Sequence, residues 1–222
     1  MIKIKDLKKS FVTKDTETHV LRGIDLEVKS GEFLGIMGKS GAGKSTLMYQ
    51  ISMLDHPTSG EIILNGINTE TLSMEERTQM RLFELGYVFQ DYALIPELTA
   101  VENVIIPLLM QDHSFAEARK IAEGVLERVG LLHRKDNKPS QLSGGEQQRV
   151  SIARAIAHNP KILFADEPTA NLDSVSGKSI IELFEELHKK GQTIVMVTHE
   201  PEYAKYCNRI VYLEDGKIVR ES

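Results

Sequence analysis

Residues 38–46 read Gly-Lys-Ser-Gly-Ala-Gly-Lys-Ser-Thr and fit the pattern G-x-x-x-x-G-K-[ST]. The apolar run at residues 33–37 is typical of a buried strand, and residues 45–54 are predicted to form a helix. Strand, glycine-rich loop and helix form the context in which this motif binds phosphate, through inward N–H groups and a positive helix end. A flexible glycine–serine turn would share these letters, but the flanking elements favour a site for a nucleoside triphosphate.

The motif assigns two side-chain roles. Lys44 is expected to reach the β- and γ-phosphates, and the Ser45 hydroxyl to bind Mg²⁺. The residues predicted to surround the phosphates are Gly38, Lys39, Ser40, Gly41, Ala42, Gly43, Lys44, Ser45 and Thr46.

Composition limits the possible settings. The chain of 222 residues is 41% hydrophobic and carries a net charge of −5, so nucleic acid is not favoured as a general partner. The single cysteine, Cys207, is expected to be a buried structural thiol, which is compatible with a cytosolic setting. The N-terminus lacks the apolar stretch of a signal peptide, and apolar runs such as residues 104–110 are too short to span a membrane. Any membrane role is therefore expected to act through a partner chain.

Hydrophobic patterning predicts an α/β protein with two kinds of sheet. Residues 2–7 and 20–28 alternate apolar and polar side chains, and with residues 61–64 they predict an antiparallel edge layer. Apolar strands are predicted at residues 86–90, 162–165 and 193–198, and a terminal hairpin turns at Asp215-Gly216. Strands that alternate with helices predict a parallel sheet covered on both faces.

The middle of the chain has a helical rather than a strand-like hydrophobic pattern. Residues 91–159 show no convincing strand, and apolar residues recur at helical spacing between Phe115 and Val129. Helices are also predicted at residues 146–158, before Asn159-Pro160, and around Ile180–Leu187, and Ser73 with Glu76 resembles a capping box. We therefore expect one domain, with residues 1–90 and 160–222 as the nucleotide-binding core and 91–159 as an inserted helical lobe.

Two carboxylates end the strand at residues 162–165. Ligands of open α/β sheets lie at the carboxyl ends of the strands, so Asp166 and Glu167 are expected in the crevice of the phosphate loop. Asp166 is placed to hold Mg²⁺, and Glu167 to polarise the attacking water. Helix capping would explain an Asp-Glu-Pro sequence equally well if the phosphate loop were absent.

A second helix start is suited to anions. Leu142-Ser-Gly-Gly-Glu-Gln-Gln-Arg149 places Ser143, Gly144 and Gly145 directly before a predicted helix. A capped helix start explains this sequence on its own. A second phosphate site in a distant lobe makes sense if it closes on a nucleotide held by another copy of the chain.

With these motifs in order, the chain resembles the nucleotide-binding subunit of ABC transporters over essentially its whole length. The resemblance rests on the phosphate loop, the signature at residues 142–149, the strand ending in Asp166-Glu167, and three further positions. These are Gln90 as the glutamine of the Q-loop, Asp173 in the D-loop Ala-Asn-Leu-Asp, and His199 as the switch histidine.

The resemblance implies a P-loop NTPase fold with a RecA-like parallel sheet. It also implies a head-to-tail homodimer that sandwiches two ATP molecules, with Ser143 and Gly145 of one subunit on the γ-phosphate held by the other. Asp173 would communicate across that interface, Gln90 would bind Mg²⁺ and sense a membrane partner, and His199 would contact the γ-phosphate. Phe11 matches the position of an aromatic ring stacked on adenine; a core residue is the alternative.

Within this family the chain is most similar to ATPases of the lipoprotein-release, macrolide-export and cell-division type. The similarity lies in residues 54–60, 90–96, 99–104 and 107–109. It departs from the pattern at Phe11, where tyrosine is common, at Ala170, where this group has glycine, and at Glu200, where aspartate is usual. None of these removes a catalytic group, so activity is expected.

The resulting expectation is a Mg²⁺-dependent ATPase with Lys44, Gln90, Glu167 and His199 as catalytic residues. It would drive a separate membrane permease from the cytoplasmic face, exporting or transmitting force to lipoprotein, peptide or drug-like cargo. Two other classes stay open: a soluble ABC-type ATPase acting on ribosomes or DNA, and a small-molecule kinase. The kinase would need neither the Ser143 helix start nor His199.

Overall fold

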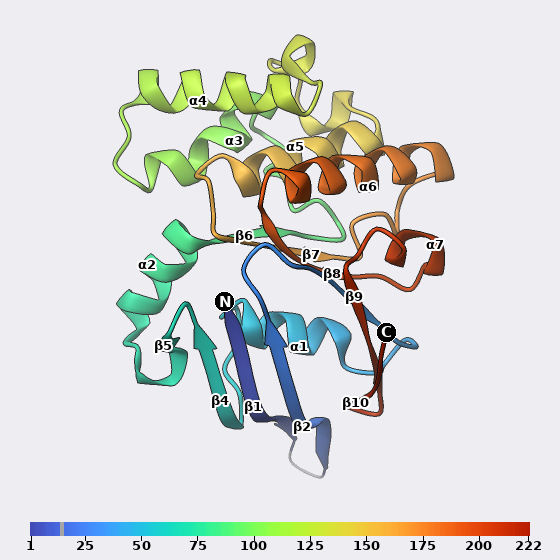
Figure 1. Ribbon diagram of the computed structural model, residues 1–222. Helices are drawn as coiled ribbons and strands as arrows, with labels where there is room; N and C mark the ends of the chain where they lie inside the picture. The colour runs from blue at the N-terminus through green and yellow to red at the C-terminus, as the bar shows by residue number, and fades with distance from the viewer. Residues whose placement is uncertain (14–15) are drawn as a thin grey trace.

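The six-stranded sheet is the frame that positions the predicted site (Figure 1). The computed structural model describes residues 1–13 and 16–222. The strands lie in the order β10-β9-β3-β8-β7-β6; they run parallel from β9 to β6, and β10 adds an antiparallel edge. Their bounds are Phe33–Met37 (β3), Leu85–Val88 (β6), Ile162–Asp166 (β7), Thr193–Val197 (β8), Arg209–Glu214 (β9) and Lys217–Glu221 (β10).

A second sheet is antiparallel and has the order β2-β1-β4-β5. Its strands are Ile2–Val12 (β1), Glu17–Val28 (β2), Ser59–Leu64 (β4) and Ile67–Asn68 (β5). This is the predicted edge layer, and its two long strands extend beyond the predicted segments. Together, the two sheets and the covering helices confirm the predicted α/β fold class.

Seven α-helices connect the strands in the described part of the chain. They span Lys44–Ile51 (α1), Met74–Glu84 (α2), Ala100–Leu109 (α3), Phe115–Arg128 (α4), Gly144–Ile156 (α5), Ser174–Lys189 (α6) and Pro201–Ala204 (α7). Capping boxes start α2, α3, α4 and α5, because in each an N-cap hydroxyl and a glutamate three residues on satisfy each other's backbone N–H groups. Short 3₁₀ turns lie at Thr69–Thr71, Leu132–Arg134 and Pro139–Gln141.

The parallel strands are buried on both faces, so alternate side chains enter two different cores. In β8, Ile194 and Met196 pack against the helical side, whereas Val195 and Val197 pack against the antiparallel sheet and α1. Figure 1 shows α3, α4, α5 and α6 on one side of the sheet, with α1 between the two sheets on the other. None of the helices in the described ranges is long and apolar enough to cross a membrane.

Several predicted boundaries differ from the structure. The helix after the phosphate loop ends at Ile51 rather than at residue 54, because Met53 has a φ of +59° that an α-helix excludes. The strand predicted to reach Gln90 ends at Val88. Residues 91–159 contain no strand, as predicted, but α3 in this segment was not predicted from the sequence. The division of residues 91–159 from the core as a separate lobe stays a prediction.

Candidate nucleotide-binding and catalytic site

The phosphate loop joins β3 to α1 at the carboxyl edge of the parallel sheet. A Cβ atom at Gly38 would lie 2.2 Å from the Leu213 carbonyl oxygen, so no larger residue fits there. Gly43 is the N-cap of α1 with a φ of +100°, and no side chain caps this helix end. The loop therefore has the tight backbone and the open helix N-terminus that a phosphate group needs.

Lys44, the first residue of α1, turns back over this loop. Its side chain is nearly buried, and its Nζ donates to the carbonyl oxygens of Gly38 at 3.0 Å and Lys39 at 3.2 Å. The same Nζ lies 3.7 Å from Oε1 of Glu167. The ammonium is thus held at the centre of the loop, where it can meet an anion.

Ser45 and Asp166 come together from different elements. The Ser45 Oγ on α1 donates to Oδ1 of Asp166, at the end of β7, over 3.2 Å. Burial raises the pKa of the Asp166 carboxyl, and the charge of Glu167 adds to this rise against the opposing effects of Ser45, Tyr87 and Lys44. A hydroxyl and a nearly buried carboxylate are oxygen ligands that suit Mg²⁺, which commonly keeps several waters and uses one or two carboxylates beside phosphate.

Glu167 and His199 form the second polar pair of this edge. Glu167 has a φ of +44°, which is uncommon for a residue with a side chain, and its N–H donates to the Val197 carbonyl oxygen at 3.1 Å. Its Oε2 lies 3.1 Å from Nδ1 of His199, which follows β8. The strained backbone thus aims the carboxylate between Lys44 and His199, consistent with a functional position. We call Lys44, Ser45, Asp166, Glu167 and His199 the phosphate-loop cluster.

A cleft of ≈ 610 Å³ opens over this cluster. Its lining includes Gly38, Lys39, Ser40, Lys44, Glu167 and His199 from the predicted set, with Met37 and Tyr212 added. A larger hollow of ≈ 1080 Å³ lies between α6 and α7, but it is lined by none of the predicted residues. The chemistry therefore points to the smaller cleft.

The remaining predicted residues gather elsewhere. Ser143 is the N-cap of α5, and its Oγ accepts from the Glu146 N–H at 3.3 Å while Glu146 Oε2 accepts from the Ser143 N–H at 2.8 Å. A Cβ at Gly144 would meet the Tyr92 hydroxyl at 2.9 Å, and one at Gly145 would meet Ser176 at 3.2 Å. The start of α5 thus lies close to the loop after β6 and to the start of α6.

Gln90 and Asp173 belong to the same neighbourhood. The carbonyl oxygen of the exposed Gln90 accepts from Asn171 Nδ2 at 3.0 Å, which ties this loop to the D-loop. Asp173 is the N-cap of α6 and accepts from the Val175 and Ser176 N–H groups, each at 3.0 Å. We call residues 143–145 with Gln90, Tyr92 and Asn171 the signature cluster. The roles given to Gln90 and Asp173 stay predictions.

Phe11 lies near the end of β1, and its side chain is 47% exposed rather than in the core. It pairs with Thr18 of β2, and two residues further along β2, the Val20 carbonyl oxygen borders Gly43 of the phosphate loop. The strand register therefore places Phe11 close to the phosphate loop.

Three contacts of the site were not predicted from the sequence. The Tyr87 hydroxyl donates to Asp166 Oδ2 at the long distance of 3.5 Å, Tyr92 contacts the signature helix, and Lys9 lies over the ring of Phe11. The sequence predicts a strand at Tyr87, but only the observed register of β6 with β7 pairs Tyr87 with Phe164, two residues before Asp166. Tyr92 and Lys9 gave no motif signal.

This arrangement is that of a P-loop protein that binds a nucleoside triphosphate. Comparison with known proteins makes the class specific, since the ABC transporter family matches residues 21–170. An uncharacterized ABC transporter ATP-binding protein of Methanocaldococcus jannaschii is 48% identical over 99% of this chain and 98% of its own length. The lipoprotein-releasing system ATP-binding protein LolD of Aquifex aeolicus is 48% identical over 91% of this chain and 90% of its own.

A longer relative and a relative of known structure also point to the ABC transporter family. The macrolide export ATP-binding/permease protein MacB of Brucella melitensis is 44% identical over the whole chain, which spans 34% of that protein. A dimeric post-hydrolysis structure of the ATP-binding cassette MJ0796, bound to ADP and Pi, has a TM-score of 0.94 and 44% identity over 100% of this chain and 98% of that one. The chain belongs to the ABC transporter family, as an ATP-binding, ATP-hydrolysing component similar to LolD and MacB. The kinase and the ribosome- or DNA-acting ATPase are not favoured.

Proposed function

We propose that the chain hydrolyses Mg²⁺·ATP in a head-to-tail homodimer and drives a membrane permease on a separate chain. The observation that carries the proposal is the convergence of Lys44, Glu167 and His199 on one cleft, with Ser45 and Asp166 beside them. Dimeric cassette structures and the LolD and MacB relatives support a dimer and a permease partner.

Catalysis follows from placement and charge. Phosphoryl transfer needs little covalent chemistry from the protein, so positioning and neutralisation supply most of the rate. Lys44 would neutralise the β- and γ-phosphates. Their oxygens would take the place of the Gly38 and Lys39 carbonyl oxygens as acceptors for its Nζ. Bound Mg²⁺, on Ser45, Asp166 and Gln90, would supply further neutralisation of the phosphates.

Glu167 and His199 would act on the water. The Glu167 carboxylate is held from two sides, by the Lys44 ammonium at 3.7 Å and the His199 ring at 3.1 Å. With the proton on Nδ1, His199 donates to this carboxylate, which fixes it to accept a proton from the attacking water. Donation from Nε2 of His199 to the γ-phosphate would require a proton on that nitrogen as well.

The site would be completed by a second copy. Ser143, Gly144 and Gly145 of the partner subunit would bind the γ-phosphate held at Lys44, with Asp173 near the interface. ATP then stabilises the closed dimer, and hydrolysis removes that stabilisation. We propose action at the cytoplasmic face of the membrane, with export or force transmission to lipoprotein, peptide or drug-like cargo. The names of two relatives, which specify lipoprotein release and macrolide export, support the lipoprotein and drug-like classes.

Two experiments test this proposal. The purified chain should release phosphate from ATP without any acceptor substrate, and this release should stop when Mg²⁺ is chelated. A tagged chain should copurify with a multispanning membrane protein. Phosphate transfer to an acceptor would instead indicate a kinase, and enrichment of ribosomes or DNA would indicate the other ATPase class.

A further inference from the structure

The ring of Phe11 is held from one side by a lysine. Lys9, two residues earlier on β1, places its Nζ over the Phe11 ring, 5.1 Å from the ring centroid. Alternate residues of a strand share a face, so the strand allows these two side chains to meet. A cation over an aromatic face within about 6 Å is attracted by the ring quadrupole.

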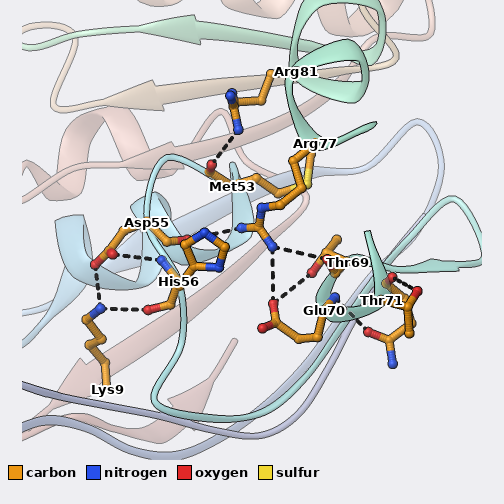
Figure 2. A network of polar contacts seen from close by, with 10 residues as sticks. Lys9, Met53, Asp55, His56, Thr69, Glu70, Thr71, Arg77 and Arg81 are labelled. Atoms are coloured by element: carbon orange, nitrogen blue, oxygen red, sulfur yellow. Dashed lines mark hydrogen bonds and ion pairs between the residues drawn. The ribbon is translucent and has the colours of Figure 1, made fainter. Parts of the chain in front are cut away.

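Lys9 is not a freely moving surface lysine. Its side chain is 12% exposed, and Nζ bonds Asp55 Oδ2 at 2.7 Å and the His56 carbonyl oxygen at 2.6 Å (Figure 2). The ammonium has three N–H donors and three close neighbours, namely the carboxylate, the carbonyl and the ring. The cation is therefore fixed against the ring.

The anchor of Lys9 is itself held in place. Asp55 lies in the loop after α1 and accepts from Gln50 Nε2 at 3.0 Å and from the His56 N–H at 2.7 Å. Burial works to raise the pKa of Asp55, but these bonds and the one from Lys9 outweigh it and lower the pKa. The nearly buried Arg77 of α2 donates to the Asp55 carbonyl oxygen at 3.4 Å, as Figure 2 shows.

This network connects two parts of the proposed nucleotide site. Helix α1 starts at Lys44 of the phosphate loop and is followed by Asp55, which holds Lys9 beside Phe11. The network therefore fixes the position of the Phe11 ring relative to α1, the helix that follows the phosphate loop.

We propose that Lys9, anchored by Asp55, is a positioning residue that holds the Phe11 ring for stacking on the adenine base. The ammonium occupies one face of the ring and leaves the opposite face to the base. The inference rests on the proposed role of Phe11. It requires that Lys9 affect the affinity for the base and leave the binding of phosphate unchanged.

The test compares a ligand with a base and one without. Calorimetry on the full chain would measure the Kd for ATP and for inorganic tripolyphosphate in Lys9→Met, with Lys5→Met as the control on the exposed part of the same strand. We expect Lys9→Met to weaken ATP binding roughly three- to tenfold, the range of a partly shielded cation–π contact. The tripolyphosphate affinity of Lys9→Met and its kcat at saturating ATP should match wild type. Lys9→Arg keeps a cation over the ring and should bind ATP as wild type does.

Other results would overturn the inference. Unchanged ATP affinity in Lys9→Met, or equal weakening for ATP and tripolyphosphate, would reduce Lys9 to a structural residue. Phe11→Ala separates this failure from that of the proposed function: unchanged ATP affinity there would remove the stacking role itself. Should Lys9→Met not fold, Asp55→Asn loosens the same anchor and should show the same ATP-selective loss.

Discussion

The phosphate-loop cluster and the signature cluster are both built on a helix N-terminus, but these two helix ends are in different states. Helix α1 starts at Gly43 with no side-chain cap and no acidic residue in its first turn. Helix α5 starts at Ser143 with a complete capping box and has Glu146 in its first turn. The first helix end is open to an anion, whereas the second already holds a carboxylate of its own.

This difference between the two helix ends predicts different roles for the two clusters in nucleotide binding. A carboxylate at a helix N-terminus uses the positive potential that an incoming anion would otherwise meet. We therefore expect the phosphate-loop cluster to bind nucleotide in a single subunit. Residues 143–145 of the signature cluster should contribute only when a second copy brings them a phosphate that is already fixed.

The largest effect is expected at the centre of the first cluster. Lys44→Ala should weaken ATP binding at least ~100-fold and abolish turnover, because charge-assisted bonds to the phosphates are lost. Calorimetry measures the affinity, and Lys120→Ala, at an exposed lysine of α4 outside the cleft, serves as the control. Normal ATP affinity in Lys44→Ala would contradict the role given to this residue.

Glu167→Gln should separate binding from chemistry within the same cluster. The amide keeps the shape of the side chain but loses its charge, so turnover should fall about 10²- to 10³-fold while ATP affinity stays near wild type. Because ATP is not consumed, the variant should accumulate as a dimer with ATP and Mg²⁺ in size-exclusion chromatography. A species that stays monomeric under these conditions would argue strongly against the sandwich dimer.

A change at Ser143 should affect turnover without affecting binding by the single subunit. Ser143→Ala removes the N-cap, so the unfolding free energy should fall by about 1 kcal/mol. Turnover should fall about tenfold through the lost bond to a charged phosphate. Ser114→Ala breaks the same capping box on α4 and controls for stability. Equal losses of turnover in both variants would show that only stability matters.

The smallest effect is expected from Glu146. The Ser143 N–H lowers the pKa of this carboxyl below its ordinary value of 4.5, against the opposing effect of burial. Its contribution to stability is therefore complete above that ordinary value and is lost as the pH falls through the lower folded pKa. Urea unfolding should show wild type more stable than Glu146→Gln at pH 7, with a smaller gap at pH 3. A constant gap would contradict a charged cap.

The sequence predicted the phosphate-loop cluster better than its surroundings. The loop motif and the strand-end carboxylates have fixed places in the fold, so Lys44, Ser45 and Asp166 could be named before the structure was known. Glu167 and His199 were named too, but only the folded chain shows their 3.1 Å contact. Contacts between distant elements that follow no motif, such as Lys9 with Asp55, could not be found in this way.

Helix α3 shows a missed local signal. Pro107 lies inside it and argues against a helix on propensity alone. Yet Thr99 and Glu102 form a capping box directly before an apolar run, a pattern that predicts a helix start. Burial of Val104, Ile105 and Leu108 in the core then outweighs the cost of the proline.

The central claim is that the phosphate loop of one subunit faces the N-terminus of α5 of another. Cysteine cross-linking tests it in Glu167→Gln, with Ser40→Cys in one preparation and Gln141→Cys in another, both at exposed positions. The native Cys207 should not compete, because burial raises the pKa of its thiol to about 12. Mixing the two preparations with ATP and Mg²⁺ should give a disulfide between Ser40→Cys and Gln141→Cys chains, and omitting ATP should abolish it. A dimer that forms with ATP but links only two Ser40→Cys chains would contradict the claim.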